Sequence, residues 1–246
     1  MKLRALLQTS LHWSRRQADT FICEQGVSVD GIKIFIPGLD VDPARQAIRI
    51  NQKKIKPAGE HVYIIFHKPI NLICSHRRQG STRTIFHLLP DNFRVLRFAG
   101  RLDKNSRGLV ILSTDGHFLQ YLSRPEYGFR RLYLVTVKGN LDINRLKQYS
   151  RNGWQDDSDR FQPFSYRIIS QTHHLTQLEI VLTEGKKREI RRLVQKLGAR
   201  VSDLLKTEHG PVKLGQLPET SWEHIPKNII TSIFKIDTRK GLNKKG

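Results

Sequence analysis

The sequence predicts an α+β protein with a small first domain and a larger second domain. Candidate strands and helices mix along the chain without a regular βα repeat, which favours a mixed, mainly antiparallel sheet flanked by helices. The polar, basic stretch NQKKIKPAGE at residues 51–60 contains a proline and a glycine and is typical of a linker. We therefore expect a first domain at residues 1–56, a linker at 57–61, a second domain at 62–238 and a mobile basic tail at 239–246.

The charge of the chain predicts a polyanionic partner. Forty-three Lys and Arg residues against 22 Asp and Glu give a formal net charge of +21, and such an excess repels itself unless a polyanion offsets it. Nucleic acid is the leading candidate. An acidic membrane surface is the alternative, but the sequence has neither a long apolar run nor a basic helix with a broad aromatic and leucine face. We expect no membrane association.

Cysteine and histidine usage argues against disulfides and metal sites. Cys23 and Cys74 are isolated and neither belongs to a CxxC pair. The ten histidines lack the i, i+4 spacing that directs two ligands to one ion. The opening segment MKLRALLQTSLHWSRR has no continuous apolar core typical of a secretory signal. We therefore expect a cytoplasmic protein without a metal.

The first domain carries signals for one helix and one hairpin. Ser14 precedes RRQADTFICEQ and Gly26 follows it, the pattern that begins and ends a helix. Asp30-Gly31 lies inside the alternating run VSVDGIKIF and predicts a hairpin turn, and a further strand is expected at residues 48–50. The segment SRRQADTFICEQGVSVDG resembles the S4 RNA-binding domain, which implies that Arg15 and Arg16 contact phosphates; the alternative is a solvated helix face.

The second domain shows candidate strands at residues 62–66, 109–113, 132–137 and 177–183. Candidate helices lie at residues 117–123, 142–149 and 187–197. No GxGxxG motif or P-loop is present, so a nucleotide cofactor is not indicated.

An isolated carboxylate stands out in the segment GRLDKNSRGLVILSTDG, residues 100–116. Asp103 lies between Arg101 and Lys104, just before an apolar strand and between two glycines that permit tight backbone geometry. It could be displayed at the mouth of a cleft, or it could cap a turn or pair with Arg101. Asp115, at the end of the segment, is expected to cap the next helix.

A second basic constellation, LTEGKKREIRRLVQKLG, occupies residues 182–198. Its helix places Ile190 on the buried side and Arg191 at the edge of the apolar face, where a cation needs a carboxylate partner. Arg188 and Arg192 are expected at more exposed positions, in contact with phosphates or solvent. Asp103 is the candidate partner of Arg191.

These segments together resemble the pseudouridine synthases of the branch that includes RsuA, RluB, RluE and RluF. The resemblance rests on the Asp103 segment, on the helix of Arg191, and on HKPINLICS, RRLYLVTVKG and HGPVKLGQLPETSW. Where that branch has a glycine after KP and one further residue, this chain has Asn71, so the local turn could differ.

The resemblance implies that a uridine of ribosomal RNA is isomerised to pseudouridine without a cofactor or metal. Asp103 would attack C1′ or abstract a ribose proton, held ionised by Arg191. Tyr133 would stack on the base and Ile190 would line the pocket floor. Arg101 would fill the space left by the extruded uridine, hold a phosphate, or form a structural ion pair.

Two further functional readings remain open from the sequence. Large-subunit 23S RNA is the expected substrate and small-subunit 16S RNA the alternative. A non-catalytic RNA-binding or ribosome-assembly factor is the rival function. A monomer is the expected oligomeric state.

Overall fold

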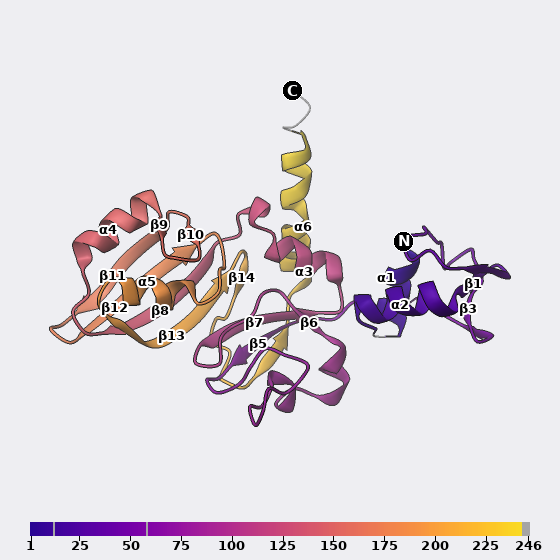
Figure 1. The fold of residues 1–246 in the computed structure, drawn as a ribbon, viewed down its shortest axis with the longest axis horizontal. Helices are drawn as coiled ribbons and strands as arrows, with labels where there is room; N and C mark the ends of the chain where they lie inside the picture. The colour runs from indigo at the N-terminus through magenta and orange to yellow at the C-terminus, as the bar shows by residue number, and fades with distance from the viewer. Residues whose placement is uncertain (12, 58, 243–246) are drawn as a thin grey trace. The chain divides into compact units, whose positions relative to one another are not determined.

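The computed structural model describes residues 1–11, 13–57 and 59–242 and divides the chain into two compact units, Met1–Val62 and Tyr63–Gly246. The first unit packs two helices against a small sheet with the strand order β2-β1-β3-β4 (Figure 1). Its elements are α1 (Leu3–Ser10), α2 (Arg15–Gln25), β1 (Val27–Val29), β2 (Ile32–Ile34), β3 (Ile48–Ile50) and β4 (Lys53–Lys54).

Helix α2 begins and ends where its capping signals predict. The Ser14 hydroxyl accepts a hydrogen bond from the backbone N–H of Gln17 at 3.2 Å, and the Gln17 side chain accepts one from the N–H of Ser14 at 2.9 Å. This reciprocal capping box satisfies two N–H groups that a helix start leaves unpaired. Gly26 follows with a φ of 71°. The hairpin at Asp30-Gly31 is also confirmed, because β1 and β2 pair antiparallel.

Two features of the first unit differ from expectation. Helix α1 was not predicted, although Leu3, Leu6 and Leu7 recur at helical spacing and are fully buried. Part of the expected linker segment at residues 51–60 belongs to the first unit, because β4 pairs with β3 and Ile55 is buried in the core of that unit. Residue 58 lies outside the described part of the chain.

The second unit is built on a nine-stranded sheet. Its central path runs β11-β12-β8-β13-β7-β5-β15, with β14 paired to β13 and β6 to β7. The strands are β5 (Tyr63–Lys68), β6 (Arg97–Phe98), β7 (Arg107–Ser113), β8 (Arg131–Lys138), β11 (Ser165–Gln171), β12 (Leu175–Leu182), β13 (Arg200–His209), β14 (Val212–Lys213) and β15 (Trp222–His224). Strands β13 and β7 run parallel, and the other pairings of this sheet in the described residues are antiparallel.

Within the described part of the second unit, four helices accompany this sheet, together with a separate pair of short strands. The helices are α3 (Gly116–Ser123), α4 (Ile143–Asn152), α5 (Glu189–Lys196) and α6 (Lys227–Leu242); the short strands are β9 (Trp154–Gln155) and β10 (Arg160–Phe161). Short 3-10 helices occupy Ile85–His87, Asp91–Val95 and Pro125–Tyr127. The α+β class and the mainly antiparallel sheet are thus confirmed, and every strand and helix expected in the second domain is present.

Among the described residues, hydrophobic side chains on the two halves of the sheet form separate cores. One core packs α4 and α5 against β8, β12 and β13, and the other packs α3 and α6 against β5 and β7 (Figure 1). The two halves meet where β7 runs beside β13 over the pairs Leu205–Arg107 and Lys206–Gly108. Gly108 has a φ of 109°, and an added Cβ would lie 2.3 Å from the carbonyl oxygen of Lys206. Only glycine allows this close approach.

The C-terminal segment differs from the expected mobile tail. Helix α6 continues through residues 239–242, and residues 243–246 lie outside the described part of the chain. Within the described residues, no helix has the length and apolar character required to cross a membrane.

Candidate active site

Asp103 lies on the loop between β6 and β7, close to the meeting point of the two halves of the sheet. Gly100 opens this loop with a φ of 79°. The carbonyl oxygen of Asp103 accepts a hydrogen bond from the N–H of Ser106 at 3.1 Å, and Ser106 is buried. The Asp103 side chain is 34% exposed. The backbone of Asp103 is therefore held by a hydrogen bond, while its carboxylate remains accessible to a ligand.

Lys68 is hydrogen-bonded to the backbone of the Asp103 loop. Its side chain is fully buried, and its ammonium group donates hydrogen bonds to the carbonyl oxygens of Ser106 at 2.6 Å and Asp103 at 3.0 Å. It also donates to Pro69 at 2.9 Å. Burial lowers the pKa of Lys68 to about 8, and the charge of Asp103 is among the groups that oppose this shift. Sequence reasoning missed this residue, although it stands in the HKP segment.

Arg188 is the cation that faces Asp103. Its Nη1 lies 3.8 Å from Oδ2 of Asp103, in an ion pair whose two side chains are partly exposed. Arg188 precedes α5 with a φ of 54°, a left-handed conformation that is rare for a residue with a side chain. The residue that caps the start of α5 therefore also carries the side chain that contacts Asp103.

Arg191 does not form the ion pair with Asp103 that the sequence predicted. It donates instead to the carbonyl oxygen of Asn105 at 2.6 Å and to the hydroxyl of Ser106 at 3.3 Å. Burial and the like charge of Arg188 lower the pKa of Arg191, and Asp103 acts in the opposite direction. Arg191 therefore supports the loop of Asp103, and Arg188 supplies the direct contact.

Tyr133 lies on β8 within electrostatic reach of Asp103. Burial raises the pKa of Tyr133 to about 12, Arg131 lowers it, and the charges of Glu189 and Asp103 raise it further. Its ring packs against the core that contains Ile190. Ile190 itself is 3% exposed, so it supports this region from within the core. The predicted position of Ile190 on the floor of an open pocket would require the groups that cover this side chain to move.

Two buried ionisable groups near Tyr133 were not singled out from the sequence. Burial raises the pKa of Glu189 to about 7, although the backbone N–H of Lys186 donates to its carboxylate at 3.0 Å. Lys206 is the register partner of Tyr133, and burial lowers its pKa to about 7. Lys206 contacts Nδ1 of His209 at 3.1 Å. Neither burial nor this pairing leaves a signal in the local sequence.

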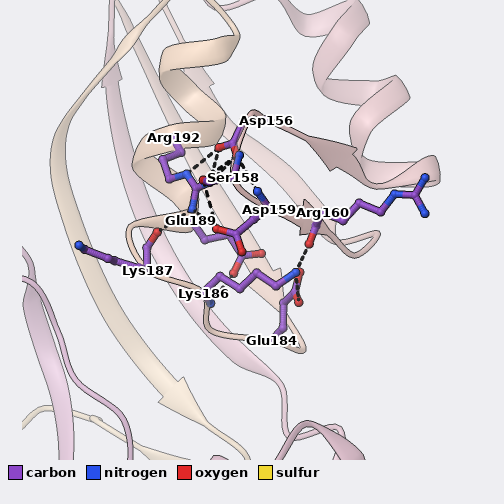
Figure 2. A network of polar contacts seen from close by, with 9 residues as sticks. All are labelled: Asp156, Ser158, Asp159, Arg160, Glu184, Lys186, Lys187, Glu189 and Arg192. Atoms are coloured by element: carbon purple, nitrogen blue, oxygen red, sulfur yellow. Dashed lines mark hydrogen bonds and ion pairs between the residues drawn. The ribbon is translucent and has the colours of Figure 1, made fainter.

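Arg192 is committed to an internal ion-pair network (Figure 2). Its guanidinium donates to Asp156 at 2.7 Å and to Asp159 at 2.8 Å, and its side chain is 22% exposed. It also lies over the ring of Phe161, 4.7 Å from the centroid. The expected exposed, phosphate-contacting position is therefore not what the structure shows: Arg192 ties the turn of residues 156–159 to helix α5.

The other predicted RNA-contacting arginines are exposed. Arg101 is exposed two residues before Asp103. Arg15 and Arg16 are exposed at the start of α2, and Arg15 lies 3.6 Å from the carboxylate of Asp19.

Asp115 caps α3 as predicted, because its carboxylate accepts from the N–H groups of His117 and Phe118. Asn71 has a φ of 66°, so the turn after Lys68 adopts the left-handed conformation that a glycine would adopt readily.

Comparison with known proteins agrees with this arrangement. The family model for RNA pseudouridylate synthase matches residues 62–196. An uncharacterized RNA pseudouridine synthase of Rickettsia typhi is 33% identical over 221 residues, which cover 90% of each chain. The ribosomal large subunit pseudouridine synthase B of Yersinia pestis is 33% identical over 251 residues, covering 96% of this chain and 77% of the relative.

A solved structure described as a pseudouridylate synthase supports the same fold. It superposes with a TM-score of 0.66 at 21% identity and covers 95% of this chain and 99% of its own. The chain therefore belongs to the RNA pseudouridine synthase family, of the type that includes ribosomal large subunit pseudouridine synthase B, and is an isomerase that acts on RNA.

Proposed function

We propose that this enzyme converts one uridine of large-subunit 23S ribosomal RNA to pseudouridine, with Asp103 as the catalytic carboxylate. The observation that carries the proposal is the geometry of the Asp103 loop. A partly exposed carboxylate stands beside Arg188 while Lys68 and Arg191 fix the backbone beneath it. The choice of ribosomal RNA follows from the 33% identity to the large-subunit enzyme of Yersinia pestis.

The reaction breaks one bond and forms another within the same nucleotide. The bond from N1 of uracil to C1′ of ribose breaks, the base rotates, and C5 bonds to C1′. The proton on C5 is then lost and N1 gains one, so the atoms balance without a co-reactant. Asp103 begins the sequence either by attack on C1′ or by removal of a ribose proton, and both roles require the carboxylate form. Nη1 of Arg188 lies 3.8 Å from Oδ2 of this carboxylate and forms an ion pair with it.

The surrounding residues position the uridine and its RNA. The Tyr133 ring lies on the strand beside the site and stacks on the target base, while Ile190 packs behind it. A uridine within a folded stem must be extruded before it reaches Asp103, which costs a few kcal/mol in stacking and pairing. Exposed Arg101 then holds the neighbouring phosphate or fills the vacated space. The first unit binds phosphates as an S4-like module through Arg15 and Arg16.

Release of tritium from RNA labelled at C5 of uridine tests this proposal. The unmodified protein should release tritium from large-subunit RNA, and Asp103→Asn should reduce the rate by at least about 10³-fold while the fold and RNA affinity persist. Asp91→Asn is the matched control and should retain full activity, because Asp91 lies exposed on the 3-10 helix Asp91–Val95 and pairs with Arg94.

The same assay separates the alternatives. Release from small-subunit RNA alone would move the substrate to 16S RNA and leave Asp103 in its role. RNA binding without tritium release from either RNA would support a non-catalytic assembly factor and overturn the proposal.

A further inference from the structure

A groove of about 430 Å³ adjoins the loop that carries Asp103. It is lined by residues of both halves of the sheet, among them Ile70, Asn105, Arg107, Arg191, Asp203 and Glu219. Its volume falls within the range of small-molecule sites, roughly 300–1,000 Å³. Asn105 is two residues from Asp103, so a nucleotide bound here would adjoin the target uridine.

Two arginines form a fixed part of the groove wall. Arg107 donates to both carboxylate oxygens of Asp203, at 2.9 and 2.7 Å. Arg191 is held by the carbonyl of Asn105, and its Nε is buried without an acceptor among the described residues. A buried donor without an acceptor is unfavourable.

Glu219 is the carboxylate of the groove that has no ion-pair partner among the described residues. It is exposed, and its charge acts on both Arg107 and Lys68. An acid on the surface of a protein with a net charge of +21 weakens attraction to phosphate at that point. Its position is therefore better suited to hydrogen-bond donors of a base than to the RNA backbone.

The loop of Glu219 is anchored and strained. The N–H of Thr220 donates to the carbonyl of His67 at 2.9 Å, and the His67 N–H donates to Ser221 at 2.9 Å. The His67 ring contacts the carbonyl of Leu217 at 2.8 Å. Thr220 has a φ of 69°, a conformation strongly disfavoured for a β-branched residue. Strain of this kind often accompanies a functional position.

We propose that this groove binds a nucleotide next to the target uridine and selects a base with an exocyclic amino group over uracil. The inference rests on the proposed function because it assumes an RNA substrate. Glu219 accepts a hydrogen bond from the amino group of cytosine, adenine or guanine. Uracil has no such group: its Watson–Crick edge offers a single N3–H flanked by two carbonyl oxygens, which the carboxylate repels. Ile70, 49% exposed, forms an apolar wall for the base.

A pool of target stem-loops tests this inference when the nucleotides flanking the uridine are randomised. Both the protein-bound fraction and the modified fraction are sequenced. At one flanking position, the unmodified protein should favour amino-bearing bases over uracil by about tenfold. Glu219→Gln should remove most of this preference, because the amide adds a donor that can pair with a uracil carbonyl. Glu223→Gln, an exposed glutamate outside the groove, removes the same charge and should leave the preference intact.

The two readouts distinguish failure of the groove from failure of the proposed function. Modification with equal use of all four bases at every flanking position would overturn the groove and leave the reaction standing. A bound pool that shows the preference without modification of any RNA would support the groove and overturn the proposed function. Loss of the preference in both Glu219→Gln and Glu223→Gln would reveal a general charge effect and would also overturn the groove.

Discussion

The basic residues predicted to contact RNA in the first unit differ from the buried or paired basic residues near Asp103 in what they contact. In the first unit, Arg15 and Arg16 are exposed on a helix start, and Arg15 has only a surface pairing at 3.6 Å. In the second unit, Lys68, Arg191 and Arg192 are committed to carbonyl oxygens or carboxylates. The basic side chains that give the chain its net charge of +21 therefore include two groups. One group is exposed, and the other is bound to carbonyl or carboxylate groups of the protein itself.

This difference shows that a basic motif does not by itself identify a phosphate-binding surface. Arg188, Arg191 and Arg192 lie within one turn of the same segment, yet they face Asp103, the backbone of its loop and an acidic turn, respectively. Removing a committed cation should alter stability or catalysis, whereas removing an available one should alter RNA affinity and its dependence on salt.

Lys68→Met should produce the largest change among the buried cations. The substitution keeps the volume of the side chain but leaves the carbonyls of Pro69, Asp103 and Ser106 without their donor. Unpaired buried acceptors should lower the free energy of unfolding by about 3 kcal/mol. Movement of the loop should reduce kcat by about 10²-fold. Chemical denaturation and single-turnover kinetics measure the two effects. Unchanged kcat would show that the loop keeps its shape without the ammonium group.

Glu189→Gln should stabilise the protein by about 2 kcal/mol at pH 8. The pKa of Glu189 is raised from 4.5 to about 7, so the folded state holds a proton that the unfolded state releases between those values. Stability from this group is therefore present below pH 4.5 and is lost as the pH rises to about 7. Urea unfolding across that range should show the gain of the variant growing with pH. A constant gain at all pH values would contradict the assignment.

Arg188→Gly should separate the cation from the unusual backbone that carries it. Glycine adopts a φ of 54° without strain, so the start of α5 should persist. Loss of the charge beside Asp103 should lower kcat by about tenfold, and Arg188→Lys should restore part of it. An equal loss in both variants would indicate that guanidinium geometry matters more than charge.

Arg15→Gln with Arg16→Gln should have the smallest effect on the enzyme itself. Stability should change by less than about 0.5 kcal/mol, while the slope of log affinity against log salt should fall by about one to two. Arg192→Gln provides the contrast: it should lower the melting temperature and leave the salt slope unchanged. A reduced slope for Arg192→Gln would place that residue among the RNA contacts.

The elements of the fold were more predictable than the contacts between them. Capping residues and apolar periodicity located α2, α3 and the main strands because those signals are local. The ion pair of Asp103 was predicted with the wrong arginine because the helix was expected to begin at residue 187. It begins at Glu189, and the left-handed Arg188 turns away from the helical register. Lys68 was missed because it contacts a loop 35 to 38 residues further along the chain.

The shared support of the Asp103 loop has a mechanical consequence. Lys68, on β5 in one half of the sheet, and Arg191, on α5 in the other half, both donate hydrogen bonds to carbonyl oxygens of this loop. Gly108 allows the two halves to approach each other closely next to the loop. A ligand that moved the two halves of the sheet relative to each other would therefore act on the contacts of both Lys68 and Arg191 with the loop. The Asp103 loop thus depends on contacts from both halves of the sheet.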